Sequence, residues 1–299
     1  MGVISPVGND VITFWDNLCN GVCGIESIKA FPTDNLPVGI AGIIKDFKPE
    51  EYGMDKPFIR KQDLFTQYGV AAAYQAMKQS GLVSQGEGQN IDPFRLGVYF
   101  GSGIGGFATQ YREIAKMIED PSGQWISPLF IPTMISNIAA GHIAIMHHAE
   151  GPCLDIVTAC ATSTNAMGEA FRAIRNGYAD AIITGGCENA TIPIGIVGFA
   201  NAKALSRATD PKYASLPFNA NRAGFVMADG SAALVLEEYE HAKARGAQIL
   251  GEMVGYGNTC DAYHSTAPRP DGTTQAKCIE LALEEAGFDK EKDNLYINA

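Results

Sequence analysis

The sequence has little positive charge and no long apolar run. Lys and Arg number 22 against 33 Asp and Glu, which gives the 299 residues a net charge of −11. Excess negative charge opposes non-specific contact with a phosphate backbone, so nucleic acid is not an expected partner. The longest segment without a charged residue, 121–149, contains three prolines and three histidines. We therefore interpret it as protein core, not as a membrane span.

The cysteines form no paired motif. There is no Cys-x-x-Cys, and the seven cysteines are scattered along the chain at positions 19, 23, 153, 160, 187, 260 and 278. An odd, scattered set in a chain of this length is not a disulfide framework and lacks the spacing of a zinc site. We expect reduced thiols, a cytoplasmic protein and no metal.

Short β-branched runs alternate with helical patterns, which is typical of a layered α/β fold with largely parallel strands. Asp63 can cap a helix that ends at Gly81. No linker interrupts the pattern, which favours one compact body. Expected strands are 96–100, 154–158, 181–184, 232–236 and 295–297; expected helices are 134–148, one after Cys160, one ending at Gly246, and one that buries Ile279, Ala282, Leu283 and Ala286.

Cys160 follows an expected strand and precedes an expected helix, so its thiol should lie on a sharp turn at a helix N-terminus. Unpaired backbone N–H groups and the positive end of the helix dipole stabilise a thiolate, and the same N–H groups can hold an oxyanion. The geometry parallels the nucleophile elbow of hydrolases. The alternative is that Cys160 is a small buried residue, as most free cysteines are.

Residues 101–106, Gly-Ser-Gly-Ile-Gly-Gly, satisfy the pattern G-x-G-x-x-G after a strand. A dinucleotide site also needs an acidic residue at the end of a second strand, and Glu119 and Asp120 follow a helical stretch instead. We favour a loop that allows close backbone approach, or a pocket wall in which Ile104 is the only bulky side chain. His264 is the best candidate for a base among the five histidines, although a structural hydrogen-bonding role is the preferred interpretation.

Ordered motifs along the whole chain are similar to those of one family. They lie at residues 5–9, 101–106, 140–142, 151–152, 158–163, 185–188, 217–219, 222–226, 236–238 and 261–264. Together they resemble the elongating 3-oxoacyl-acyl carrier protein synthases, the beta-ketoacyl synthases of the thiolase superfamily, and most of all the branch that handles longer acyl chains. The resemblance implies a thiolase-like layered α-β-α-β-α fold, with the first half at 1–224 and part of the second half at 225–299.

The same resemblance implies a chemistry. Cys160 would take an acyl group from an acyl carrier protein as a thioester, and malonyl carrier protein would lose carbon dioxide and attack it, in fatty acid or polyketide elongation. Ile104 would line the acyl pocket, and Thr266, Lys203 and Arg207 would lie at the pantetheine entrance. No metal or soluble cofactor is implied, because phosphopantetheine arrives on the carrier protein. A homodimer is expected.

One departure limits that expectation. In the family, a strand ending in Asn-Ala is followed by His-Gly-Thr, whose His is catalytic, and a Lys and a second His come later, whereas this sequence stops at Ala299. We therefore expect the chain as given to be inactive in condensation. Two alternatives stay open: a non-catalytic carrier-binding or dimerisation module of the same fold, and a thiolase-type acyl-CoA enzyme.

Overall fold

The computed structural model describes residues 1–298. The chain forms two compact units, Met1–Ala247 and residues 248 onward, instead of the single body expected from the sequence. The strand that follows Phe225 belongs to the sheet of the first unit, and the expected boundary between the two halves at residue 225 stays a prediction. None of the helices among residues 1–298 is both long and apolar enough to cross a membrane.

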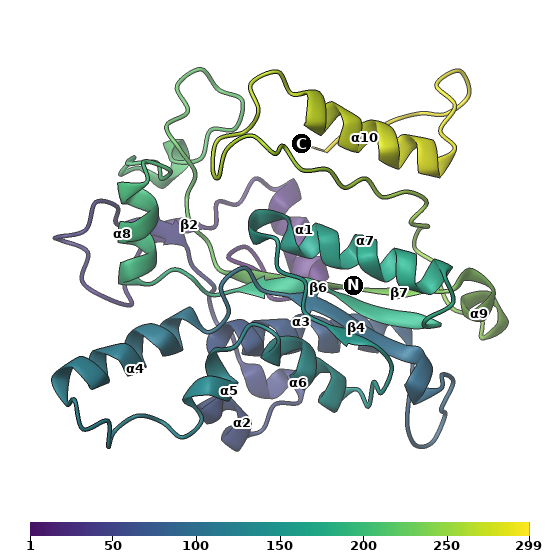
Figure 1. The fold of residues 1–299 in the computed structure, drawn as a ribbon, viewed down its shortest axis with the longest axis horizontal. Helices are drawn as coiled ribbons and strands as arrows, with labels where there is room; N and C mark the ends of the chain where they lie inside the picture. The colour runs from purple at the N-terminus through teal and green to yellow at the C-terminus, as the bar shows by residue number, and fades with distance from the viewer. Residues whose placement is uncertain (299) are drawn as a thin grey trace. The chain divides into compact units, whose positions relative to one another are not determined.

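A five-stranded mixed sheet is the centre of the first unit (Figure 1). Its order is β1-β7-β6-β4-β5. β4 pairs in parallel with β5 and β6, while β7 runs antiparallel to β6 and β1. The expectation of largely parallel strands is therefore only half right. The strands are β1 (Gly2–Ile4), β4 (Leu96–Gly101), β5 (Cys153–Leu154), β6 (Ala181–Glu188) and β7 (Gly230–Glu237).

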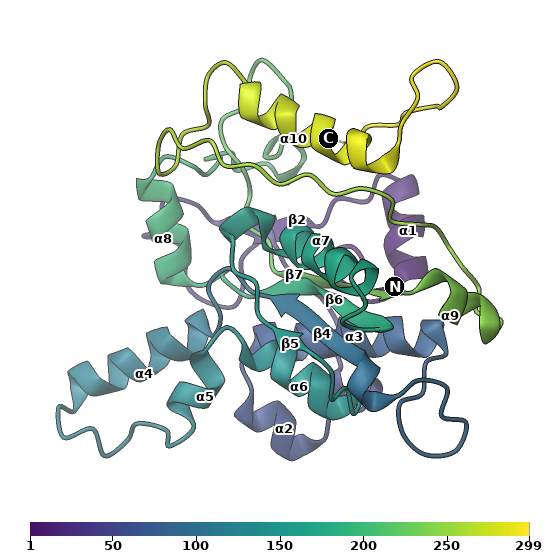
Figure 2. The same ribbon diagram turned by 45° about the vertical axis from the view of Figure 1, so that its right-hand side comes forward.

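Helices cover both faces of this sheet. α3 (Leu64–Ser80) and α6 (Ile138–Met146) pack on one face and α7 (Thr162–Arg175) on the other (Figure 2). β4 and most of β6 are buried, as continuous apolar strands between two layers should be. α3 begins and ends where the sequence predicts: Asp63 accepts a hydrogen bond from the Phe65 amide, and Gly81 ends the helix in the left-handed conformation.

Smaller elements complete the first unit. A second apolar cluster joins the two-stranded sheet to α8. The elements are α1 (Val11–Cys19), β2 (Ile25–Ser27), β3 (Ile40–Gly42), η1 (Pro49–Tyr52), α2 (Lys56–Lys61), η2 (Pro93–Arg95), α4 (Phe107–Glu119), α5 (Phe130–Met134), η3 (Ala159–Ala161), α8 (Pro193–Asn201), η4 (Pro211–Tyr213) and α9 (Tyr239–Ala244).

Two expected elements are shorter than the sequence suggested. The strand expected at 154–158 pairs only at Cys153 and Leu154, after which the chain leaves β4 to form the turn before α7. The helix expected at 134–148 is confined to α6, because the chain adopts an extended conformation at Ile135 between α5 and α6.

The second unit consists of an extended segment and one helix, α10 (Thr273–Ala286). Gly255 and Gly257 allow that segment to lie directly on the α10 backbone, where a Cβ would clash with Ala282 and Cys278. The sequence predicted this helix but was wrong about its burial, since no α10 residue is buried and Ile279 is 52% exposed. Only one segment of the unit covers the helix. The strand expected at 295–297 is also wrong, because no described strand pairs with it.

His147, the C-cap of α6, is expected to make folding pH-dependent. Burial, with a smaller contribution from His148, lowers the pKa of His147 to about 4, and its Nε2 has no hydrogen-bond partner among the described residues. An imidazole in the unfolded chain titrates near ~6.5. Between these values the unfolded chain binds more protons, so stability is lost as the pH falls from about 6.5 toward 4.

We expect His147→Phe to remove about 2 kcal/mol of the stability that wild type loses between about pH 7.5 and about pH 5. Urea unfolding at the two pH values measures this. Burial also lowers the pKa of His142, but that residue is present in both proteins and cancels in the comparison. The control variant carries the same substitution at the exposed His264. If His147→Phe kept the pH dependence of wild type, His147 would not be its source.

Candidate active site at the Cys160 turn

Cys160 is an exposed thiol on the turn that the sequence predicted. It lies in η3, immediately before α7, and the backbone of the preceding Ala159 has a positive φ of 50°. A positive φ is uncommon for a residue with a Cβ and marks a sharp, locally strained turn. The alternative that Cys160 is a small buried residue is wrong, and its reactivity stays a prediction.

Glycines in the sheet allow α7 to begin close to the strand ends. A Cβ on Gly101 would lie closer than 3.0 Å to Thr162 in the first turn of α7 and to the Ile156 carbonyl. On the neighbouring strand, Gly186 faces Ser163 in the same way. The turn is fixed further by Thr162 Oγ1, which accepts a hydrogen bond from the Thr158 amide at 2.9 Å.

The residue before α7 offers the first amides of the helix no side-chain acceptor. The N-cap is Ala161, which makes no side-chain capping bond, whereas Ser, Thr, Asp or Asn usually fills this position. The positive end of the helix dipole favours an anion here. The arrangement suits the oxyanion that forms when a thioester is attacked beside Cys160.

The glycine-rich loop lies against this turn. A Cβ on Gly103 would be 3.7 Å from the Ala159 carbonyl oxygen, so the loop and the Cys160 turn are neighbours. Its G-x-G-x-x-G pattern does not leave the amide of Gly103 free for a phosphate, because that N–H donates to Glu188 Oε2 at 2.8 Å. Ile104, at the tip of the loop, is 37% exposed.

Three carboxylates around the loop and strand ends were not singled out from the sequence. Burial raises the pKa of Glu188, Asp155 and Asp229, and hydrogen bonds to each carboxylate oppose the rise. Asp229 accepts from the Ala190 and Thr191 amides at 2.9 and 3.0 Å. No local sequence pattern identifies these partners, because each hydrogen bond joins residues far apart in the chain.

The other predicted site residues occupy different parts of the structure. Lys203 and Arg207 are exposed within four residues of each other after α8. Thr266 belongs to the second unit, where its amide and that of Ala267 donate to His264 Nδ1 at 3.1 and 3.0 Å. This agrees with the structural hydrogen-bonding role preferred for His264.

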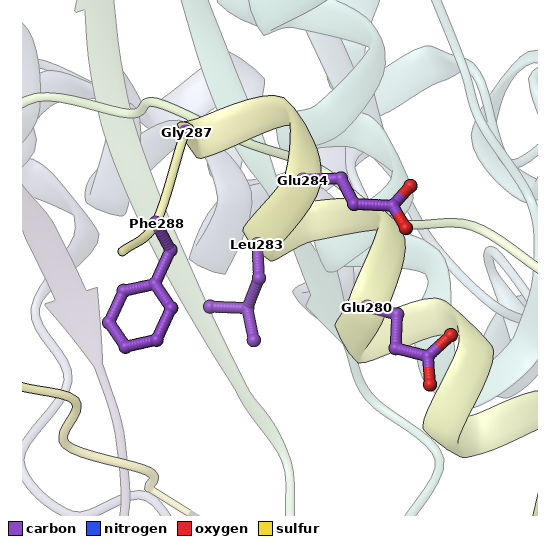
Figure 3. Close-up of a pocket in the computed structure, with 5 residues that line it drawn as sticks. All are labelled: Glu280, Leu283, Glu284, Gly287 and Phe288. Atoms are coloured by element: carbon purple, nitrogen blue, oxygen red, sulfur yellow. The ribbon is translucent and has the colours of Figure 1, made fainter. Parts of the chain in front are cut away.

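Other features offer no competing site. A shallow hollow of about 240 Å³ lies at the end of α10, where the Glu280 and Glu284 carboxylates point away from Leu283 and Phe288 (Figure 3). Within the part of the chain that the structure describes, no cysteine, serine, threonine, lysine or histidine lines it. Across residues 1–298 there is no group of three His, Cys, Asp or Glu side chains placed to hold a metal ion.

The chain matches known proteins along its length. Residues 1–242 match the family Beta-ketoacyl synthase, N-terminal domain, and residues 250–299 match Beta-ketoacyl synthase, C-terminal domain. The 3-oxoacyl-[acyl-carrier-protein] synthase 2 of Vibrio cholerae serotype O1 is 45% identical across 100% of this chain and 71% of the relative. The enzyme of the same name from Staphylococcus aureus strain N315 is 44% identical across 100% of this chain and 70% of its own length.

Solved structures agree on the fold. A ketosynthase in complex with its type II polyketide synthase acyl-carrier protein, bound to the hexaketide, has a TM-score of 0.85 and 30% identity over 96% of this chain and 68% of that one. A beta-ketoacyl synthase from Burkholderia phymatum STM815 has a TM-score of 0.84 and 29% identity over 96% and 70%. The expected thiolase-like α/β fold is confirmed. The matches across both parts of the chain place it in the beta-ketoacyl synthase family.

Proposed function

We propose that this protein is a 3-oxoacyl-acyl carrier protein synthase in which Cys160 carries the growing acyl chain. The observation that supports this most directly is the exposed Cys160 thiol at the uncapped start of α7, beside the glycine loop. The similar proteins named 3-oxoacyl-[acyl-carrier-protein] synthase 2 support the same assignment.

The proposed reaction begins with acyl transfer. The Cys160 thiolate attacks the thioester carbon of an acyl carrier protein, the carbonyl oxygen becomes an oxyanion, and the pantetheine thiolate leaves and takes a proton. The product is an acyl thioester on Cys160. The first-turn amides of α7 are the donors that can stabilise this oxyanion.

Condensation follows with malonyl carrier protein. Loss of carbon dioxide leaves an enolate, whose carbon attacks the Cys160 thioester and releases the Cys160 thiolate with the 3-oxoacyl carrier protein. No metal or soluble cofactor enters this sequence, since the phosphopantetheine arm belongs to the carrier protein. The developing enolate needs hydrogen-bond donors. The absence of condensation activity in residues 1–299 stays a prediction.

Intact-protein mass spectrometry tests the proposal. After incubation with an acyl carrier protein thioester, the chain should gain the mass of one acyl group. Malonyl carrier protein is then added, and the 3-oxoacyl product is measured separately. The absence of any acyl adduct with saturated carriers of several chain lengths would contradict the proposed function.

We place Ile104 in the wall of the acyl pocket. It is the bulky residue in a run of glycines beside the Cys160 turn, so a larger side chain there should shorten the available space. Ile104→Phe is expected to reduce the rate of Cys160 acylation by long acyl groups about tenfold or more, with short groups affected less. An unchanged preference across acyl lengths would remove Ile104 from the pocket.

Lys203 and Arg207 are proposed to receive the carrier protein. Both are exposed, and positive charge grouped on an otherwise acidic protein steers an acidic partner. The double substitution Lys203→Glu with Arg207→Glu should slow association about tenfold at low salt and weaken its salt dependence.

Binding measured at two ionic strengths checks this prediction. The matched control is Lys290→Glu with Lys292→Glu, which changes the net charge equally at two exposed lysines of the second unit. The cluster Lys56, Arg60 and Lys61 on α2 is the alternative docking site. Affinity that is indifferent to both salt and the double reversal would exclude Lys203 and Arg207.

We also propose that the protein is a cytoplasmic homodimer. β5 is an edge strand of the central sheet, and Leu154 in this strand and Val157 in the segment after it are each 50% exposed. An uncovered strand edge with apolar side chains is a site for pairing with another chain. A second copy of this protein is the partner that fits the proposed function.

A further inference from the structure

Glu188 joins two elements that the proposed mechanism needs. It is the last residue of β6, the strand next to β4 in the sheet (Figure 2). Its carboxylate accepts hydrogen bonds from the glycine loop that follows β4. Glu188 Oε1 accepts a hydrogen bond from Ser102 Oγ at 2.9 Å, and Oε2 accepts one from the Gly103 amide at 2.8 Å.

Ser102 connects the Glu188 carboxylate to Gly105, the residue that follows Ile104. Its hydroxyl, which donates to Glu188, also accepts a hydrogen bond from the Gly105 amide at 2.9 Å. The Ser102 side chain is buried, so water does not replace these bonds readily. The amides on both sides of Ile104 are therefore fixed by one carboxylate, directly at Gly103 and through Ser102 at Gly105.

Neighbouring atoms pack closely around the glycine loop and restrict its backbone to one conformation. A Cβ on Gly103 would lie 2.7 Å from Glu188 Oε2, and one on Gly105 would lie 2.8 Å from the Met134 carbonyl oxygen. Gly105 also has a positive φ of 76°, which residues with a side chain rarely adopt. Ile104 is consequently held at a tip whose two flanking residues are confined.

The chain maintains this carboxylate at an energetic cost. Burial raises the pKa of Glu188, and hydrogen bonds from Ser102, Gly103 and Ile104 oppose that rise. Among the described residues, no Lys or Arg forms an ion pair with it. A partly buried carboxylate without a cationic partner must be stabilised by its hydrogen-bond donors, which here are groups of the glycine loop.

We propose that Glu188 is a positioning residue that sets acyl-chain selectivity, because it fixes the Gly103 and Gly105 amides and with them the place of the Ile104 side chain. The inference rests on the proposed role of Ile104 in the acyl pocket. It makes a prediction about the loop itself, which holds whether or not the protein transfers acyl groups.

Hydrogen–deuterium exchange tests the hold on the loop. In Glu188→Ala, the amides of Gly103 and Gly105 should exchange at least about tenfold faster than in wild type. Glu188→Gln should restore most of the protection, because its oxygen can accept from Gly103 while its amide donates to Ser102 Oγ. Ser102→Ala should accelerate exchange at Gly105.

The control is Glu237→Ala. Glu237 is another partly buried carboxylate, and it lies at the opposite end of the same strand pair, across from Ala181, where it binds Arg245 and His241. A general loss of stability would affect the loop similarly in both alanine variants. A local hold predicts faster loop exchange in Glu188→Ala alone.

Acylation of Cys160 tests the selectivity. The measured quantity is the ratio of the second-order rate constants for acylation by carrier proteins that bear long and short acyl groups. In Glu188→Ala this ratio should move about tenfold closer to one, whereas Glu188→Gln should stay close to wild type. Loop exchange within twofold of wild type in Glu188→Ala would overturn the proposal. Faster exchange with an unchanged ratio would overturn it as well. No acylation of wild type by any carrier would instead contradict the proposed function, and the exchange result would still decide whether Glu188 holds the loop.

Discussion

Replacement of Cys160 by alanine is expected to abolish acyl transfer from a carrier protein to this chain, with a loss of at least about a thousandfold. The reason is chemical, since the substitution removes the sulfur that attacks the thioester and carries the acyl group. Cys19→Ala is the matched control. Cys19 is also an exposed thiol, but it is the last residue of α1 and has no helix N-terminus beside it.

Alkylation of the native chain should show the same selectivity. Under limited iodoacetamide, Cys160 is expected to react several-fold faster than any other cysteine. Cys187 is buried and burial raises the pKa of its thiol; burial and Asp155 raise the pKa of Cys153. Peptide mapping identifies the modified residue. Preferential labelling of Cys19, Cys23 or Cys260, or an acyl adduct that persists in Cys160→Ala, would exclude Cys160 as the nucleophile.

The Cys160 turn could be predicted because its determinants are local. A β-branched run, a small-residue turn and an amphipathic helix follow one another in the sequence. The helix buries Ala166 and Ala170, whereas Met167, Phe171 and Ile174, which its apolar pattern also predicts to be buried, are only partly buried. The strand before the turn was expected to be longer than it is. The length of β5 depends on how many residues of β4 remain available for backbone hydrogen bonds. The sequence of 154–158 does not contain that information.

Interactions between distant segments could not be predicted in this way. Glu188 and Ser102 are separated by 86 residues, and Asp229 meets the Ala190 amide across 39. An apolar periodicity also does not say what covers it, which is why the helix containing Ile279 was predicted correctly while its burial was not. Propensity and pattern identify an element, whereas its neighbours decide its environment.

Gly101→Ala is expected to destabilise the first unit by about 3 kcal/mol or more and to slow alkylation of Cys160 in the protein that still folds. Gly101 ends β4, and a Cβ there would press on both the Ile156 carbonyl and Thr162. Neither neighbour can yield easily, because one is backbone and the other lies in the first turn of α7. Relief of the clash must therefore move the start of α7 away from the sheet, and Cys160 with it.

The matched control is Gly141→Ala in α6. A Cβ on Gly141 meets open space, and alanine has the higher helix propensity, so this variant should be more stable than wild type by about 0.5–1 kcal/mol. Urea unfolding and the alkylation rate of Cys160 are measured for both variants. If α7 must approach the sheet closely, Gly101→Ala should lower the stability and Gly141→Ala should raise it. Only Gly101→Ala should slow the alkylation of Cys160. If Gly101→Ala were as stable as wild type and its Cys160 as reactive, the glycine would not be what permits α7 to begin beside the strand ends.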